Sequence, residues 1–243
     1  MAAATVMQTE KVPWVEIIVI FFVVLLLTLG TYRRNNIWNS TIGLQLDAVN
    51  KSPGKARPYT NLAFAYLGAG MYDKALEAGQ KAIRLDPKGA YAYYVMGTAY
   101  QKLGDLEKAI VMARKALDID PKLDEVHYTL GGFYFEKGQY EEAAQEFRAF
   151  LKLFPYFPNV HHLLGVVYAG QRKFAQAVAE FENELKVDQY HTLAHLNLGQ
   201  IYWYEFQNRE KALYHLKAAL MIDPLLPERN QIRALVRMLE GRS

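Results

Sequence analysis

The chain has 243 residues, of which 28 are Lys or Arg and 25 are Asp or Glu, and it has no cysteine. Half of the residues (51%) are hydrophobic, too many for a disordered chain, and a net charge of +3 does not favour a nucleic-acid partner. The lack of cysteine excludes disulfides, Cys-ligated zinc, iron–sulfur clusters and a catalytic thiol.

The first element in the chain is an apolar segment. Residues Ile17 to Leu29 are apolar apart from Thr28, and Trp14 and Tyr32 flank them. A helix over 14–32 would span roughly 28 Å, close to the hydrocarbon core of a bilayer. Aromatic rings at both ends suit the two headgroup layers. We therefore predict a transmembrane helix at residues 14–32, after a short tail of residues 1–13.

A cleaved signal peptide is the main alternative for this segment, because Thr28-Leu29-Gly30 offers the small residues that a signal peptidase needs. Lys11 is the only Lys or Arg before the apolar run, whereas Arg33 and Arg34 follow it. This distribution of positive charge favours an anchor over a signal peptide. By the positive-inside rule the same arginines favour the cytoplasmic side for the rest of the chain, without excluding the extracytoplasmic side.

The rest of the chain repeats every 34 residues. The tyrosine series is Tyr66, Tyr100, Tyr134, Tyr168 and Tyr202, and the glycine series is Gly97, Gly131, Gly165 and Gly199. The alanine series is Ala75, Ala109, Ala143 and Ala177, and it reaches Ala212 after one inserted residue. Prolines recur in the same way at Pro53, Pro87, Pro121 and Pro155.

Each unit is predicted to contain two amphipathic helices, for example Tyr91–Leu103 and Leu106–Ile119, joined at Gly104-Asp105. The small residues let the two helices approach closely, and the proline ends the second helix. The turn glycine takes the left-handed conformation. Arg172 and Phe206 stand in its place in the fourth and fifth units, and Glu184 replaces a small residue. Because one helix pair cannot bury its apolar stripe alone, the units are expected to stack.

Leu-Gly-x-x-Tyr followed by Gly, Ala and Pro at these spacings resembles the tetratricopeptide repeat family. The resemblance implies an all-α fold, a right-handed α-solenoid of helix-turn-helix repeats, preceded here by the transmembrane helix. Its five units are 56–89, 90–123, 124–157, 158–191 and 192–225. Before them, residues 33–55 are expected to form a linker and a half-repeat helix near Trp38–Pro53. After them, residues 226–243 are expected to form a capping helix at Pro227–Leu239.

In this family, five positions of each unit face a concave groove that binds protein segments. The resemblance places nine side chains there: Arg57, Phe64, Tyr91, Tyr94, Tyr128, Phe135, His162, Trp203 and Tyr204. They form an aromatic, weakly charged trough that suits an extended peptide or an amphipathic helix of a protein partner. Arg57 and Asn61 match one pair of the clamp that binds chain-terminal carboxylates in some members, but Tyr91 and Val95 do not continue it.

A second resemblance covers about residues 31–66, which include Thr31-Tyr32-Arg33-Arg34-Asn35 and Lys51-Ser52-Pro53-Gly54. It is similar to the junction between the last membrane helix and the repeats in polytopic glycosyltransferases of the protein O-mannosyl type. In that family the repeats lie outside the cytoplasm, the side opposite to the one that the arginines favour. The side of the membrane is therefore left open.

Other motifs favour structural interpretations. Asp118-Ile119-Asp120 matches a glycosyltransferase metal–nucleotide motif, but it falls at a helix end before a proline. His191 and His195 are four residues apart, without the intervening Glu of a metalloprotease helix. The repeat position that is Trp in the family is Tyr59, Tyr93, His127, His161 and His195, which points to packing.

The sequence therefore predicts a membrane-anchored interaction scaffold that is not an enzyme, has no cofactor, metal or small-molecule substrate, and binds a protein partner. Two alternatives remain: a fixed structural subunit of a larger membrane complex, and an accessory module of a glycosyltransferase system.

Overall fold

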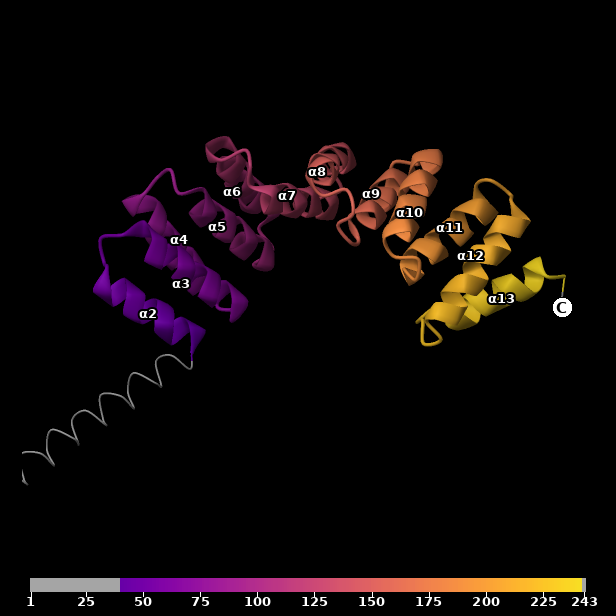
Figure 1. Ribbon diagram of the computed structural model, residues 1–243, viewed down its shortest axis with the longest axis horizontal. Coiled ribbons are helices and arrows are strands. Elements are labelled where there is room, and N and C mark those ends of the chain that lie inside the picture. Colours follow the sequence, from indigo (N-terminus) through magenta and orange to yellow (C-terminus); the bar gives the residue numbers. More distant parts are fainter. Residues whose placement is uncertain (1–39, 242–243) are drawn as a thin grey trace, which may run out of the picture.

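The computed structural model describes residues 40–241, and every regular element among them is an α-helix (Figure 1). The described residues begin with α2 (Thr41–Lys51) and end with α13 (Arg229–Leu239), and five helix pairs lie between them. The pairs are α3 (Ala56–Gly68) with α4 (Tyr72–Leu85), α5 (Ala90–Lys102) with α6 (Leu106–Ile119), α7 (Asp124–Glu136) with α8 (Tyr140–Leu153), α9 (Val160–Gly170) with α10 (Phe174–Val187), and α11 (Thr192–Tyr204) with α12 (Arg209–Ile222). The predicted all-α solenoid of helix pairs is confirmed.

The tail predicted at residues 1–13, the transmembrane helix predicted at residues 14–32, and residues 33–39 of the segment after it lie outside the described residues. Between residues 40 and 241, no helix is both long and apolar enough to cross a membrane.

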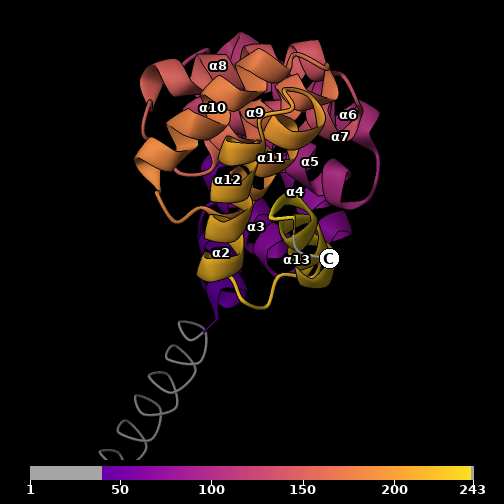
Figure 2. The ribbon, with the colours of Figure 1, turned by 90° about the vertical axis from the view of Figure 1, so that its right-hand side faces the viewer.

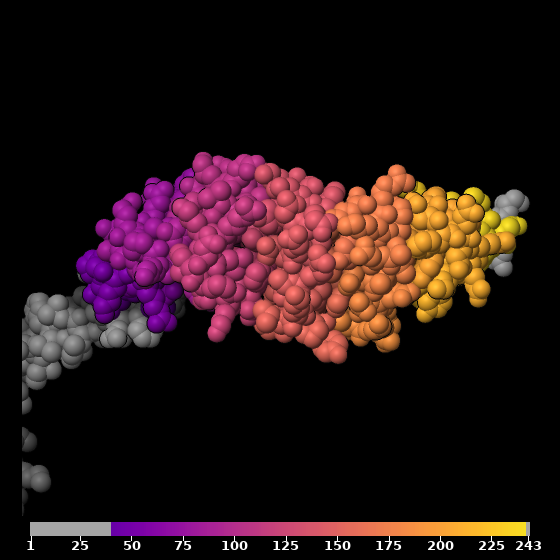
Figure 3. All heavy atoms as spheres, turned by 90° about the horizontal axis from the view of Figure 1, so that it is seen from above, coloured from indigo at the N-terminus to yellow at the C-terminus, as the bar shows by residue number. Residues whose placement is uncertain are grey.

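The pairs follow one another along an arch, and the end helices α2 and α13 both lie on its lower side in the view of Figure 1. Seen along the length of the arch, successive pairs turn about a common axis (Figure 2). From above, the chain runs from one end of an elongated body to the other without doubling back (Figure 3). The first helices of neighbouring pairs also touch directly, α3 with α5 and α5 with α7. We call the surface that the first helices α3, α5, α7, α9 and α11 form the concave face.

Two rows of small residues set the packing of each pair. Ala109, Ala143, Ala177 and Ala212 are fully buried on the second helices. Opposite them, a Cβ at Gly131 would stand 2.8 Å from the Phe147 ring, and one at Gly165 would stand 2.7 Å from the Phe181 ring. These contacts are closer than van der Waals distance, so only glycine lets the two helices approach this far.

The turn inside each pair requires one residue with a positive φ. It is a glycine in the first three pairs: Gly70, Gly104 and Gly138. Arg172 takes this conformation in the fourth pair (φ 59°) and Gln207 in the fifth (φ 51°). The prediction for Phe206 was therefore wrong, because the inserted residue between α11 and α12 moves the left-handed position by one. Phe206 instead packs its ring against Tyr202, with centroids 6.0 Å apart.

The two end helices close the stack differently. At the N-terminal end, the Ser40 hydroxyl caps α2 by accepting from the Gly43 amide at 3.2 Å, and α2 has no fully buried residue. At the other end α13 buries Ile232, Val236 and Leu239, while Arg233 and Arg237 are exposed. This capping helix begins at Arg229 rather than at Pro227.

Candidate functional site

The nine side chains expected in the groove are distributed over the five first helices, and their exposure differs. Three are exposed: Arg57, Tyr91 (46%) and Tyr204 (65%). Five are half-buried: Phe64, Tyr94, Tyr128, Phe135 and Trp203. The ninth, His162, is 7% exposed and therefore belongs to the core rather than to an open trough.

A hollow of about 500 Å³ lies between the first turns of α3 and α5, and we call it the N-terminal hollow. Arg57, Asn61 and Phe64 line it from α3, and Tyr91 lines it from α5. The Phe64 and Tyr91 rings meet edge to face at 6.4 Å. Burial raises the pKa of the Tyr91 hydroxyl, and nearby carboxylates, Glu125 first, raise it further. The hydroxyl therefore stays protonated and available as a donor.

Polar side chains cross between neighbouring first helices. The Tyr94 and Thr129 hydroxyls lie 3.3 Å apart, which ties α5 to α7. Gln101 Nε2 donates to the Glu136 carboxylate at 2.9 Å between the same helices. Because these groups satisfy one another, Tyr94 contributes its ring rather than a free hydroxyl to the concave face.

His162 forms the corresponding contact between α9 and α11. Asn197 Nδ2 donates to His162 Nε2 at 3.1 Å, so the imidazole serves as an acceptor and must be neutral there. Burial, together with His191 at a ring distance of 4.8 Å, lowers the pKa of His162 to about 4. The prediction of His162 as a groove residue is corrected: its ring holds the fourth and fifth pairs together.

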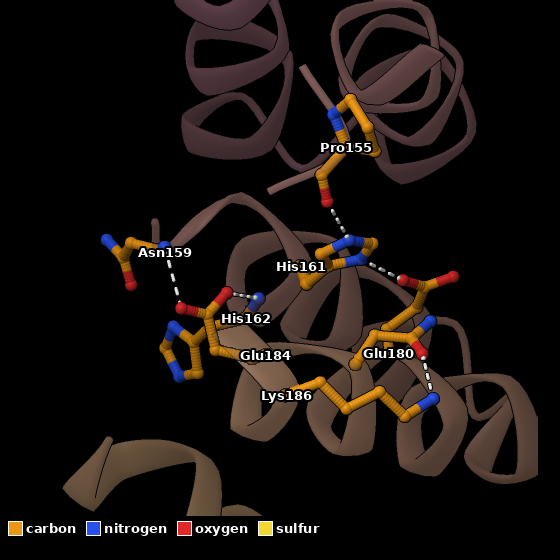
Figure 4. A network of polar contacts seen from close by, with 8 residues as sticks. Pro155, Asn159, His161, His162, Glu180, Glu184 and Lys186 are labelled. Atoms are coloured by element: carbon orange, nitrogen blue, oxygen red, sulfur yellow. Dashed lines mark hydrogen bonds and ion pairs between the residues drawn. The ribbon is translucent and has the colours of Figure 1, made fainter. Parts of the chain in front are cut away.

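Directly behind His162 lies a buried carboxylate, Glu184, which is 0% exposed (Figure 4). Its Oε1 accepts from the Asn159 amide at 2.7 Å, and its Oε2 accepts from the His162 amide at 3.1 Å. Asn159 has a left-handed φ of 71° and precedes α9, which begins two residues later than the 34-residue step predicts. The carboxylate thus caps α9 from the end of α10, which is why an acidic residue stands where three of the other four units have alanine.

In three of the five units, the position that is Trp in related repeats holds a ring that donates to a carbonyl of the preceding loop. The donors are Tyr93 Oη to Pro87 O (3.3 Å), His161 Nε2 to Pro155 O (3.0 Å) and His195 Nε2 to Gln189 O (3.1 Å). Two of the histidines also contact a glutamate on their own second helix, His127 with Glu146 and His161 with Glu180, each at 2.6 Å. Each histidine of this series is therefore held by its own second helix, by the loop just before its unit, or by both.

In the fifth unit a second histidine replaces the glutamate. His195 and His215 face each other with their Nδ1 atoms 2.9 Å apart. Since His195 donates through Nε2, its Nδ1 must accept and His215 Nδ1 must carry the proton. Burial, then His195 and Lys211, lowers the pKa of His215 to about 4. In residues 40–241 there is no group of three or more His, Asp or Glu side chains that could hold a metal ion.

The remaining motifs have structural roles. Asp120 follows the last residue of α6 and accepts from the Lys122 amide at 3.0 Å, as Asp86 does from the Lys88 amide. His191 is the residue before α11, and its Nδ1 accepts from the Ala194 amide at 3.1 Å.

A second hollow was missed by the sequence analysis, apart from one of its residues, Tyr128. It has a volume of about 200 Å³, and we call it the aromatic hollow. Its lining residues come from the start of α7 and the end of α8 with the loop that follows: Asp124, Glu125, Tyr128, Phe150, Phe154 and Phe157. Aligning the units position by position was the available signal, because it isolates these aromatic residues in the third unit.

Models of the tetratricopeptide repeat match this chain at residues 90–123 and 162–227, and a TPR repeat model matches residues 65–104 and 133–172. Together these matches cover more than half of the chain. A comparison with curated proteins gives no match.

Solved structures with this fold are available for comparison. YrrB, described as a TPR protein with an unusual peptide-binding site, is 26% identical with a TM-score of 0.70, over 78% of this chain and 97% of its own. MamA from Desulfovibrio magneticus RS-1, from residue 41 to its end, is 22% identical with a TM-score of 0.65, over 71% of this chain and 97% of its own. The Pseudomonas aeruginosa protein pilF is 24% identical with a TM-score of 0.59, over 76% of this chain and 88% of its own. The last two likenesses concern the fold alone.

Proposed function

Because this chain belongs to the tetratricopeptide repeat family, we propose that it is a non-catalytic scaffold that binds an extended segment of a protein partner on its concave face. The N-terminal hollow is the observation that carries the proposal. It combines a cationic side chain, an amide and two aromatic rings in an open cavity between two first helices. Such a set can receive both the backbone and an anchor side chain of a peptide.

Two further features support a ligand path along the concave face. Exposed rings stand on the second and the last helix of this face, Tyr91 on α5 and Tyr204 on α11. Between them lies Gly132, where an added Cβ would meet nothing within 4 Å, so the middle of the path is open. YrrB, similar to this chain over most of its length, is itself described as a TPR protein with a peptide-binding site.

The test removes exposed rings, because their loss should change the free energy of unfolding only slightly. The double variant Tyr91→Ala/Tyr204→Ala should lose most binding in a selection of phage-displayed random peptides against the full chain. Its matched control is Tyr190→Ala/Tyr214→Ala, which removes two rings that are at least as exposed, one in the loop after α10 and one on α12. Each groove ring acting as an anchor should contribute about 2 kcal/mol to binding. Equal peptide recovery by both double variants would refute the proposal.

A fixed structural subunit is the alternative reading of the same fold. Such a subunit would co-purify with its partner in constant stoichiometry, and its concave face would bury the partner permanently. A scaffold would release its partner on dilution and exchange it for an added peptide.

We also propose that residues 14–32 anchor the chain in a bilayer. The apolar run between Trp14 and Tyr32 supports this proposal. The full chain should remain with membranes after alkaline carbonate extraction, whereas residues 36–243 should be soluble and strongly helical. Release of the full chain by carbonate would contradict the anchor. Protease protection of the repeats in sealed vesicles would then show on which side they lie.

A further inference from the structure

The repeat itself separates what the solenoid needs from what one unit adds. A residue that recurs at the same position of every unit serves the stack, whereas a residue present in one unit needs another reason. The aromatic hollow differs from the rest of the stack in this way. Five of its six lining residues have no counterpart of the same type in any other unit.

Phe154 is the clearest of these differences. The corresponding residue in the other four units is an aspartate: Asp86, Asp120, Asp188 and Asp223. Each aspartate accepts from the backbone amide two residues later, at 2.8 to 3.0 Å, which stabilises the loop. In the third unit this side-chain contact to the loop is absent, and Phe154 places a ring there that is 40% exposed.

Phe150 and Phe157 depart from the pattern together with Phe154. Phe150 replaces Ala82, Ala116, Glu184 and Ala219, and Phe157 replaces Gly89, Leu123, His191 and Leu226. The Phe150 ring lies 5.2 Å from the Phe154 ring and 5.1 Å from the Phe157 ring. Tyr128 approaches Phe150 to 5.6 Å. The rings form the walls of one cavity of about 200 Å³, which has room for a single side chain and not for a helix.

Two acidic residues are among those that line the same cavity. Asp124 and Glu125 form the first turn of α7, where the other units have Ala56-Arg57, Ala90-Tyr91, Pro158-Asn159 and Thr192-Leu193. Neither side chain has a hydrogen bond or an ion pair with another residue in the range 40–241. The same carboxylates help to raise the pKa of Tyr91, so their negative potential extends along the edge of the concave face.

We infer that the aromatic hollow receives the side chain of a lysine or arginine from a basic segment of a protein partner. The aliphatic stem of such a residue packs against aromatic rings, and its cation gains both from the ring faces and from the two carboxylates. An acidic side chain would be repelled by Asp124 and Glu125. A purely apolar one would remove these carboxylates from water without giving them a partner.

This inference rests on the proposed function, because Tyr128 belongs both to the concave face and to the hollow. It adds the chemistry of the partner, namely positive charge next to apolar residues. It also accounts for the acidic first turn of α7 in a way that can be distinguished from helix stabilisation alone.

The experiment is a selection of phage-displayed random peptides against the full chain and three variants. Asp124→Asn/Glu125→Gln removes the charge and keeps the shape. Phe154→Asn removes a ring while retaining a side chain that can bond the loop amide, as the aspartates of the other units do. Asp73→Asn/Glu77→Gln is the matched control, with the same change of charge at exposed positions on α4.

The wild-type chain and the α4 control should enrich peptides in which Lys or Arg is flanked by apolar residues. The Asp124→Asn/Glu125→Gln variant should lose that enrichment. A synthetic peptide from the wild-type selection should bind this variant and Phe154→Asn on the order of ten-fold more weakly. Added salt should weaken wild-type binding more than binding to the charge-neutral variant.

The two proposals fail in different ways. Suppose that the selected peptides depend on Tyr91 and Tyr204 but are not enriched in Lys or Arg, or that they bind Asp124→Asn/Glu125→Gln as tightly as the wild type. The hollow then does not bind basic side chains selectively, and this inference is wrong. If no peptide is enriched, or the enriched ones ignore Tyr91 and Tyr204, the concave-face proposal fails and this inference with it. Melting temperatures of the variants close to that of the wild type would show that the fold is intact in either case.

Discussion

Adjacent glycines in α7 provide a direct test of how the pairs pack. Gly131 faces α8, and an added Cβ would lie 2.8 Å from Phe147 Cε1 and 2.9 Å from its Cδ1. At Gly132, by contrast, the same Cβ would meet nothing within 4 Å. Replacing either glycine by alanine in a helix interior favours the helix by about 1 kcal/mol. The two substitutions therefore share their backbone effect and differ in sterics.

We expect Gly132→Ala to raise the free energy of unfolding by about 0.5–1 kcal/mol. Gly131→Ala gains the same helix propensity, but it forces the Phe147 ring or the α7–α8 spacing to shift, which costs about 1–3 kcal/mol. Phe147 is 1% exposed and packs against Tyr128, so its ring has little room to turn away. Gly131→Ala should therefore be less stable than Gly132→Ala by about 1–3 kcal/mol.

Urea unfolding followed by far-ultraviolet circular dichroism measures this difference, with equal slopes required for a valid comparison. A Gly131→Ala variant as stable as Gly132→Ala would show that α7 and α8 do not approach each other so closely that only glycine fits between them. The close α7–α8 packing described above would then be wrong.

Two further predictions concern the fourth pair, α9 with α10. The pKa of His162 is 6.5 in the unfolded chain and about 4 in the folded chain, so between these values the unfolded chain binds one more proton. The contribution of His162 to the free energy of unfolding is therefore complete above about pH 6.5. As the pH falls towards 4, up to about 3 kcal/mol of that contribution is lost. The difference in stability between the wild type and His162→Gln should therefore shrink on acidification from pH 7 to pH 4 in parallel urea titrations, and a constant difference would contradict the neutral, buried imidazole. Glu184→Ala should cost about 1–2 kcal/mol by uncapping α9, and hydrogen exchange should accelerate at the Asn159 and His162 amides while the first turn of α7 is unaffected. Unchanged exchange at these two amides would show that the carboxylate is not the cap.

The sequence by itself determined the architecture. A step of 34 residues in Tyr, Gly, Ala and Pro is enough to define paired helices, because each of these residue types has a local role. The tyrosine ring fills space between helices, Gly and Ala allow close helix contact, and Pro ends the second helix. The same regularity identified Arg172 as the residue in the left-handed turn, where the structure gives a φ of 59°. It failed at Phe206, where one inserted residue displaced the register.

Only the tertiary structure decided which aromatic residues are available. His162 and Tyr91 both occupy concave positions of their units, yet one is 7% and the other 46% exposed. The difference depends on contacts with the next unit, Asn197 and His191 for His162, and no periodicity within one unit encodes those contacts. Glu184 is a similar case, since its carboxylate caps a helix that begins 24 residues before it in the chain.

The aromatic hollow is a further case in which the sequence does not show which residues are neighbours in space. Tyr128, Phe150 and Phe157 are separated by up to 29 positions in the sequence, and they meet because α7 and α8 are antiparallel and the loop after α8 folds back over their ends. The repeat tells which residues are unusual, but the packing of the helices determines that the unusual ones are neighbours. Side chains that contact across a pair or between pairs are fixed by three-dimensional distance, which a one-dimensional period does not contain.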